Sequence, residues 1–439
     1  MQQIYFDLTE LIHASLTIPR ITGIQRVVLM TAKALQKKHP KTKFFFRHPF
    51  DRKFYIFDEI DLEKFNDLHD FYPISRHWRI GSLKFSLTKR TIKESKKITT
   101  AIKAIVQFTA ANLLKHCEAK VLHTKNNISF RIFFATPNQP VTFLEFAIID
   151  PDKYKSFFKT FSNARFVFFI HDIIPLTHPH LVNYKEVNLF KKYTPFVVEN
   201  ANLILTSSKY NIFTLNTWIK NKKYSTNIRA IEAIPLPCDL PSYSENQPLK
   251  DIREEIRFLK EYRYCLCVGS VGIRKNHFSL IQAWLKFWNS NKYNNELLVI
   301  AGTSSFSLIE NILKNHPAAG SILLLSNINE KELAFLYENC RFTAYPSLLE
   351  GWGLPISESI GFGKPVILIN ASSTPEASFG VGTIVQKDSL NEMLKAIEEL
   401  FGNVNYYNIC IDKIKNKQNI LPTWEQFSER VFSLIQDIN

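Results

Sequence analysis

The sequence predicts an α/β protein of two doubly wound domains, on the strength of three observations. The chain has 439 residues, 45% of them hydrophobic, which is longer than a single core usually organises. Short apolar segments alternate with helical segments, a pattern typical of parallel sheets covered on both faces. A proline-rich, polar stretch at residues 236–249 separates two halves of similar size. We therefore expect domains at residues 1–240 and 241–439.

The expected strands are short, nearly continuous apolar runs in both halves. Helices are expected between them, for example at residues 278–288 and 330–339. Because ligands of doubly wound sheets bind beyond the carboxyl ends of the strands, substrates are expected in the cleft between the domains. The runs are residues 4–8, 44–46, 128–134, 142–149, 166–170 and 203–206, followed by 264–268, 297–301, 322–325, 342–345 and 366–369.

One segment interrupts this alternation: residues 82–122 have a helical pattern and form a basic insertion in the first domain. Between residues 84 and 103, seven basic residues stand against Glu94 alone, and apolar residues occupy the opposite side of the helix. Two interpretations stay open. The basic side is either a solvated face of a helix packed on the sheet, or a surface that docks on an anionic membrane.

The net charge of +15 favours an anionic partner, such as a phosphorylated substrate, an acidic membrane surface or nucleic acid. Nucleic acid is not expected, because no recognition-helix, RNA-binding or zinc signature is present. The six cysteines lie far apart except for Cys265 and Cys267, which are expected as small buried residues on one face of a strand. Without an apolar leader or a long apolar run, the protein is expected in the cytoplasm, either free or peripheral on the cytosolic face of the membrane.

The strongest chemical signal is the segment 345–358, Tyr-Pro-Ser-Leu-Leu-Glu-Gly-Trp-Gly-Leu-Pro-Ile-Ser-Glu. It predicts a strand end, a glycine-bearing loop and a helix that accepts Pro355 in its first turn. Glu350 then lies on the loop and Glu358 in the early helix, both expected on the cleft wall and outside the core. Carboxylates suit the paired hydroxyls of a sugar or a ribose, and the helix N-terminus suits a diphosphate. The alternative is a pair of glutamates that only complement the helix dipole.

A second signal is the loop 269–277, Gly-Ser-Val-Gly-Ile-Arg-Lys-Asn-His, between a strand and a helix. Gly269 and Gly272 permit close backbone approach, and Arg274 with Lys275 places two cations beside a helix start. This combination suits a pyrophosphate, although an ordinary exposed turn is the alternative. The glycine spacing differs from Gly-x-Gly-x-x-Gly, which argues against a nicotinamide cofactor.

Weaker signals come from the first half. His171 and Asp172 follow a buried strand and are expected at the cleft, although a histidine there is often a packing residue. Gly23 and Arg26 open a helix after the first strand, where they can approach a phosphate or an acceptor. Residues 150–152, Asp-Pro-Asp, match a metal-binding motif formally, but a helix N-cap is the simpler interpretation.

These segments resemble motifs of the retaining GT-B glycosyltransferases, the large family that includes bacterial mannosyltransferases and sucrose synthases. Residues 350–358 resemble the Glu-x7-Glu motif, which implies that Glu350 contacts the donor sugar and Glu358 the nucleotide ribose. Residues 269–276 resemble the loop whose cations neutralise the departing diphosphate, which implies that role for Arg274 and Lys275. The resemblance implies the GT-B fold, with two Rossmann-like domains facing across a cleft.

Further elements extend the resemblance over most of both domains. His171 matches a histidine near the transferred sugar and is expected to contact the sugar or the acceptor, while Asp172 is expected to be an orienting or structural residue. Gly23 and Arg26 match an element that lines the cleft on the acceptor side. Residues 372–376 match another loop near the sugar, and residues 423–424 match the start of a final helix that crosses back to the first domain. The implied donor-binding set is Gly269, Gly272, Arg274, Lys275, Glu350, Gly351, Gly353, Leu354 and Glu358.

The resemblance implies a function as well. The first domain would bind the acceptor and the second a nucleotide diphosphate sugar, such as GDP-mannose or a UDP-hexose. A hexose, with mannose favoured, would pass to a glycan or lipid-linked acceptor in bacterial surface polysaccharide synthesis, without a metal or other cofactor. His171, Arg274, Lys275 and Glu350 are the expected catalytic residues. Two alternatives are a nucleotide-sugar epimerase with this fold and a non-catalytic sugar-binding assembly subunit.

Overall fold

The computed structural model describes residues 3–16, 21–48, 53–71, 74, 122–123, 129–132, 141–238, 252–290, 295–302 and 306–438. The predicted basic insertion at 82–122, including the helix expected at 84–103, therefore lies outside the described residues except for its last residue, Leu122. The proline-rich stretch is described only up to residue 238.

The first sheet has the strand order β4-β5-β3-β2-β1-β6-β7-β8-β9. Every strand predicted in the first half is present. From β2 to β9 the neighbouring strands are parallel, and the order reverses direction at the β1/β6 pair. Its strands are β1 (Gln3–Asp7), β2 (Lys43–Arg47), β3 (Phe54–Glu59), β4 (Leu122–His123), β5 (Ser129–Ile132), β6 (Val141–Glu145), β7 (Arg165–Ile170), β8 (Leu203–Thr206) and β9 (Ala230–Ala233).

One edge of this sheet corrects the prediction of parallel strands. β3 pairs antiparallel with β2 and with β5, and β4 pairs antiparallel with β5. The connection from β2 to β3 covers only residues 48–53, which is too short for a crossover helix. Because a parallel partner needs such a crossover, a short connection returns the chain as an antiparallel neighbour.

The second sheet has the order β12-β11-β10-β13-β14-β15 and is parallel throughout. Here the order reverses between β10 and β13, so the loops that follow these two strands meet at the switch point where doubly wound sheets bind ligands. All strands predicted in the second half are present. They are β10 (Arg263–Val268), β11 (Glu296–Gly302), β12 (Ile322–Ser326), β13 (Phe342–Tyr345), β14 (Val366–Ile369) and β15 (Thr383–Val385).

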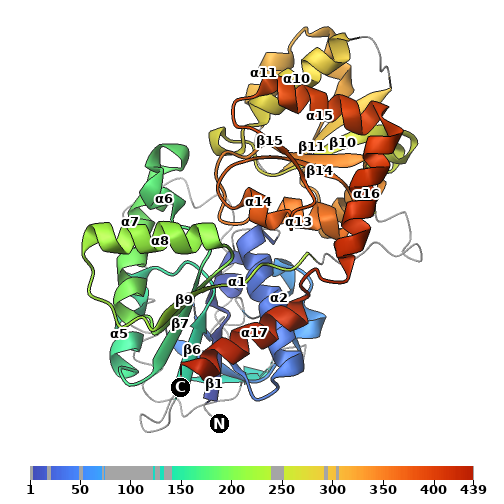
Figure 1. The fold of residues 1–439 in the computed structure, drawn as a ribbon. Helices are drawn as coiled ribbons and strands as arrows, with labels where there is room; N and C mark the ends of the chain where they lie inside the picture. The colour runs from blue at the N-terminus through green and yellow to red at the C-terminus, as the bar shows by residue number, and fades with distance from the viewer. Residues whose placement is uncertain are drawn as a thin grey trace, which may run out of the picture.

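Helices lie on both faces of each sheet (Figure 1). In the first domain they are α1 (Thr9–Ala14), α2 (Gly23–Lys38), α5 (Pro151–Thr160), α6 (Ile174–Thr177), α7 (Tyr184–Asn200) and α8 (Lys209–Lys222). In the second they are α9 (Glu254–Arg257), α10 (His277–Asn289), α11 (Ser307–Leu313), α12 (Glu330–Asn339), α13 (Leu354–Gly361), α14 (Thr374–Ala377), α15 (Leu390–Gly402) and α16 (Val404–Gln418), followed by α17 (Trp424–Asp437).

Alternating residues of single strands enter different cores, as a sheet covered on both faces requires. Cys265 and Cys267 of β10 belong to one apolar cluster, whereas Tyr264 and Leu266 belong to another. The two cysteines are thus buried on one face, as predicted. None of the helices in the described ranges combines the length and hydrophobicity needed to cross a membrane.

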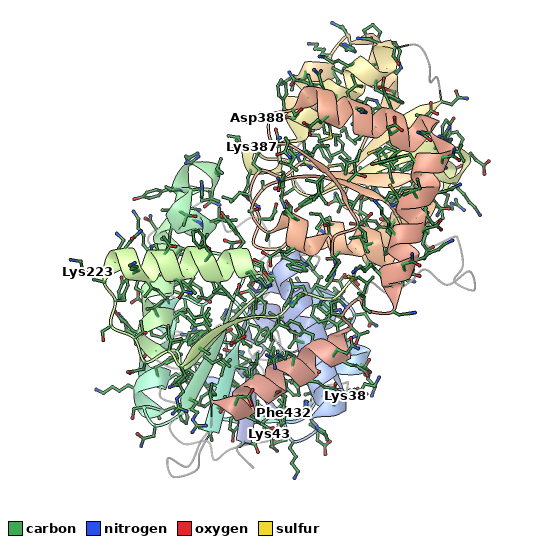
Figure 2. The ribbon with its side chains drawn as sticks, viewed as in Figure 1. Lys38, Lys43, Lys223, Lys387, Asp388 and Phe432 are labelled. Atoms are coloured by element: carbon green, nitrogen blue, oxygen red, sulfur yellow. The ribbon has the colours of Figure 1, made fainter. Side chains whose placement is uncertain are left out.

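Helix α17 lies against α2 of the first domain, whereas α15, two helices before it, packs on the second domain (Figure 1). Lys38 of α2 forms an ion pair with Glu425 of α17 at 2.9 Å. His39, directly after α2, stacks on the ring of Phe432 with 3.7 Å between centroids (Figure 2). Apolar residues of α17 join the same core as β1 and β7, so the last helix completes the first domain.

Asp150 begins α5 as its N-cap, since its carboxylate accepts a hydrogen bond from the backbone N–H of Asp152 at 3.2 Å. Asp152 itself pairs with Lys155 and Lys192 on the surface. The predicted capping role of this Asp-Pro-Asp segment is confirmed.

Candidate active site

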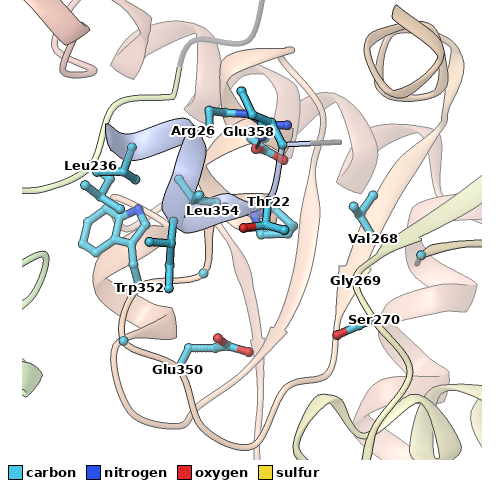
Figure 3. A pocket seen from close by; sticks show the side chains of 18 of the residues that line it. Thr22, Arg26, Leu236, Val268, Gly269, Ser270, Glu350, Trp352, Leu354 and Glu358 are labelled. Atoms are coloured by element: carbon cyan, nitrogen blue, oxygen red, sulfur yellow. Dashed lines mark hydrogen bonds and ion pairs between the residues drawn. The ribbon is translucent and has the colours of Figure 1, made fainter. Parts of the chain in front are cut away.

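A cavity of about 640 Å³ lies between the domains, where loops from both sheets converge (Figure 3). Thr22 and Arg26 reach it from the start of α2 in the first domain, and Glu358 of α13 in the second domain lies beside Arg26. Gly272 is the one predicted site residue that is not among its described lining residues. The predicted residues brought together are Gly23, Arg26, His171, Asp172, Gly269, Arg274, Lys275, Glu350, Gly351, Gly353, Leu354 and Glu358.

Glu350 is bound on both carboxylate oxygens. Its Oε1 lies 2.7 Å from the ammonium of Lys275 and its Oε2 lies 2.7 Å from the guanidinium of Arg274. The hydroxyls of Ser347 and Tyr345 also donate to Oε1, at 2.5 and 3.0 Å. Burial alone would raise the pKa of Glu350, but the two cations outweigh it and lower the pKa to about 2. The cluster of Glu350, Arg274 and Lys275 therefore carries one net positive charge at the wall of the cleft.

Both glutamates line the cleft, as expected, and both are buried there. Glu350 is 8% exposed and Glu358 is 4% exposed. Buried carboxylates need partners because unpaired charges are costly away from water. Within the protein, Glu350 pairs with Arg274 and Lys275, and Glu358 pairs with Arg26.

Glu358 connects the two domains. Its Oε1 lies 2.6 Å from the guanidinium of Arg26, which α2 contributes from the first domain. The other oxygen accepts a hydrogen bond from the hydroxyl of Tyr337 at 2.8 Å. Arg26 also pairs with Glu330 at 3.1 Å. A carboxylate has about four lone-pair sites, so Glu358 retains capacity to accept from a ligand while holding Arg26.

Lys275 is largely buried, with 15% of its side chain exposed. Burial lowers the pKa of its ammonium, opposed by Glu350 and assisted by the neighbouring charge of Arg274. A lysine with a lowered pKa is charged below that pKa and loses its proton as the pH rises through it. The positive charge of the cluster is therefore lost at a lower pH than for an exposed lysine.

We expect activity to fall on the alkaline side before the ordinary lysine pKa of about 10.4 is reached. The measurement is the pH profile of kcat/KM, which reports ionisations of the free enzyme. In Lys275→Arg the alkaline limb should move to higher pH, because the guanidinium stays protonated. Identical alkaline limbs in the two proteins would contradict this assignment.

His171 is held by its ring nitrogen Nε2, which lies 2.8 Å from the carbonyl oxygen of Phe146. A carbonyl only accepts, so Nε2 carries the hydrogen and Nδ1 is the acceptor. Burial lowers the pKa of His171 to about 4, which makes the ring neutral at physiological pH. Next to it, Asp172 accepts from the N–H of Ile174 at 2.9 Å and fixes the start of α6, while burial raises its pKa. The pair thus offers a neutral acceptor and an orienting carboxylate at the first domain's side of the cleft.

Several contributors were not predicted from sequence. Tyr345 and Ser347 bind Glu350, and Tyr337 binds Glu358, although nothing in their spacing indicates such contacts. Ser207 and Asn211 contact the backbone of the Glu350 loop from the first domain. Their position just beyond the carboxyl end of β8 could have indicated a place at the cleft, because the carboxyl ends of neighbouring parallel strands lie at the same edge of the sheet.

The loop 372–376 lies next to Glu350, as the hydroxyl of Ser372 accepts from the Glu350 N–H at 2.8 Å and that of Ser373 donates to the Glu350 carbonyl at 2.8 Å. Glu376, however, does not point to the cleft. Its carboxylate accepts from the backbone N–H groups of Lys209 and Tyr210, at the first turn of α8 in the other domain. The described residues contain no group of three His, Cys, Asp or Glu side chains arranged to hold a metal ion.

Comparisons with known proteins place this chain beside glycosyltransferases. Residues 249–417 match the model of the family described as Glycosyl transferases group 1. The chain is 27% identical over 230 residues to O-antigen chain mannosyltransferase B of Escherichia coli, covering 50% of this chain and 57% of that protein. It is 24% identical over 238 residues to the serotype-specific mannosyltransferase WbdA of Escherichia coli, covering 53% of this chain and 29% of that protein. The alignments thus span little more than half of the first relative and under a third of the second.

Among solved structures, sucrose-phosphate synthase from Thermosynechococcus elongatus aligns with a TM-score of 0.61 at 16% identity, covering 100% of this chain and 99% of that chain. At this identity the likeness establishes the fold alone. The predicted GT-B fold is confirmed, and the family match and relatives support the predicted enzyme class, a glycosyltransferase.

Proposed function

We propose that the chain transfers a hexose, with mannose favoured, from a nucleotide diphosphate sugar to a glycan or lipid-linked acceptor. The observation that carries this proposal is the cluster of Glu350, Arg274 and Lys275 at the switch point of the second sheet. It presents one net positive charge to the cleft beside the N-terminus of α13, an arrangement suited to a diphosphate. The mannosyltransferase relatives support the choice of sugar, and the relative named as an O-antigen chain mannosyltransferase supports a role in bacterial surface polysaccharide synthesis.

In the proposed reaction, the bond between the anomeric carbon and the donor phosphate breaks, and Arg274 and Lys275 stabilise the charge on the departing diphosphate. Glu350 faces the sugar as positive charge develops on the ring. Electrostatic stabilisation by preorganised groups is commonly the largest single contribution to catalysis. The acceptor hydroxyl then attacks from the face that the diphosphate leaves and passes its proton to the departing phosphate oxygen, with the neutral His171 beside it. Retention of configuration rests on the resemblance of the Glu350–Glu358 segment to the Glu-x7-Glu motif.

A panel of nucleotide sugars, with GDP-mannose and UDP-hexoses, tests this function. The expected results are thermal stabilisation by one donor and slow donor hydrolysis, with transfer once a glycan or lipid-linked acceptor is added. All should persist in excess EDTA, because the cations already supply the charge that a metal would supply. Activity lost in EDTA and restored by Mn²⁺ or Mg²⁺ would argue against metal independence. Epimerised donor without acceptor would instead identify an epimerase, and binding without turnover a sugar-binding subunit.

The role of Glu358 predicts a change in donor KM. A contact with the ribose is the same in ground state and transition state, so its loss weakens binding and leaves kcat nearly unchanged. Hydrogen bonds to a charged group contribute about 1.5 to 3 kcal/mol, so KM should rise roughly 10- to 100-fold in Glu358→Gln. Steady-state kinetics with varied donor provide the measurement. Glu425→Gln, which removes a surface pair between α2 and α17, is the control and should keep the KM of the wild type. A fall in kcat at constant KM would contradict the proposed contact between Glu358 and the donor ribose.

The predicted basic helix at residues 84–103 remains a proposal, with the enzyme held on the cytosolic face of an anionic membrane near its acceptor. Replacing Lys89, Lys93, Lys96 and Lys97 by glutamine should weaken binding to anionic vesicles. Added salt should weaken wild-type binding in the same way, because it screens the attraction. Vesicle binding that is unchanged by the four substitutions would leave the helix as a solvated surface.

A further inference from the structure

The loop that carries Glu350 is docked onto the first domain through the backbone of the next residue, Gly351. The carbonyl oxygen of Gly351 accepts hydrogen bonds from the hydroxyls of Ser207 and Ser208, at 2.9 and 3.0 Å, and from the side-chain amide of Asn211 at 2.9 Å. All three donors are buried and lie at or just before the start of α8. A single carbonyl of the second domain therefore accepts hydrogen bonds from three side chains in one turn of the first domain.

Asn211 makes a second contact that reaches the other half of the site. The same Nδ2 donates to the carbonyl oxygen of His171 at 2.8 Å. A side-chain amide has two hydrogens, so one can serve each carbonyl. With only 3% of its surface exposed, Asn211 joins the backbone at His171 to the backbone at Gly351 without competition from water.

The two backbones approach so closely that only glycine fits at position 351. A Cβ added there would lie 2.1 Å from the carbonyl oxygen of His171 and 2.9 Å from the Cβ of Asp172. A second link braces the same helix, since Glu376 of the second domain accepts from the N–H groups of Lys209 and Tyr210. A carboxylate at a helix N-terminus is also favoured by the helix dipole.

We propose that Asn211 is a positioning residue that sets the separation between His171 on the acceptor side and Glu350 on the donor side. This inference rests on the proposed function for its kinetic consequence. Asn211 acts through the backbone at His171 and at Gly351, and it contacts neither the donor nor the acceptor. Without Asn211, each domain keeps its own site residues, but the separation between the two halves of the site is no longer fixed.

The test is Asn211→Asp, which keeps the shape and replaces the donating nitrogen by an oxygen that faces two carbonyl oxygens. Misplacement of reacting groups by about 1 Å costs roughly 100-fold, so kcat should fall by about that factor. Stabilisation by the nucleotide diphosphate alone should persist, because the donor-binding residues belong to the second domain. At lower pH the new carboxyl gains a proton and can again donate one hydrogen bond, so part of the lost kcat should return on the acid side.

Hydrogen exchange gives a readout that does not need turnover. Exchange should become faster both at residues 207–212 and at residues 350–353 in Asn211→Asp. Gly351→Ala, which forces the same backbones apart from the other side, should reproduce this double effect. The matched control is Asn200→Asp, because the amide of Asn200 donates at 2.7 Å to the Phe196 carbonyl within one helix of the first domain.

Faster exchange confined to residues 207–212, or an unchanged kcat, would overturn the positioning role. If the wild type transferred sugar from no donor in the panel, the proposed function would fail. The exchange of the two segments would then still decide whether Asn211 ties the domains together.

Discussion

Replacing Glu350 by glutamine is expected to lower both stability and turnover. The substitution removes the carboxylate that bridges Arg274 and Lys275 and leaves two neighbouring cations in a largely buried site. Removing one partner of a buried ion pair costs about 3 to 5 kcal/mol, which corresponds to a fall on the order of 10 °C in melting temperature. Turnover should fall as well, because the new side chain no longer offers a negative charge to the developing positive charge on the sugar. Thermal unfolding and steady-state kinetics measure the two effects.

The control for Glu350 is Glu332→Gln. Glu332 is also buried, at 2% exposure, and pairs with Arg253 at 2.8 Å, but it does not line the cleft. Its loss should lower the melting temperature and leave kcat unchanged. Equal kcat values for Glu350→Gln and the wild type would exclude Glu350 from the reaction.

Replacing Lys275 by methionine is expected to reduce turnover with less loss of stability. Methionine matches the apolar part of the lysine side chain, and Glu350 keeps Arg274 as its partner at 2.7 Å. The cluster then has no net positive charge for the diphosphate. Removing one preorganised stabilising group typically costs about 100- to 1000-fold in kcat.

An exposed lysine of α10 supplies the control: Lys286→Met should keep wild-type kcat. The double variant of Lys275→Met with Glu350→Gln should be less destabilised than the sum of the single variants, since residues in one ion-pair network couple. A kcat of Lys275→Met within twofold of the wild type would show that the leaving diphosphate does not depend on this cation.

The fold was largely predictable because most of the buried parallel strands are continuous apolar runs with a helix after them. β3 escaped prediction because Asp58 and Glu59 end its apolar run, and β15 because Thr383–Val385 is very short. The antiparallel edge depends on the connection between β2 and β3 and not on the residues of the strands. The apolar pattern of a strand indicates how it is buried, whereas its direction depends on how the chain connects it to its neighbours.

The site shows a different limit. Glycines, cations and carboxylates at strand ends indicated which residues face the cleft, because strand ends of one sheet lie at one edge. Their partners could not be predicted: Arg26 and Glu358 are 332 positions apart and meet only when the domains pack. Asn211 is likewise an ordinary residue in the first turn of a helix, and its role depends on the two carbonyls that tertiary structure brings within its reach.

The return of α17 to the first domain also affects how the protein is made. Domains usually fold in the order in which they leave the ribosome, from the N-terminus onward. Here the core that contains Phe146 and Phe169 also needs Phe427 and Val431, so it stays incomplete until the last helix has been synthesised. During translation all strands of the second domain are synthesised before α17. An apolar face of the first domain stays exposed until then. A ribosome that stalls before residue 424 would therefore hold a nascent chain whose exposed face is a target for chaperones.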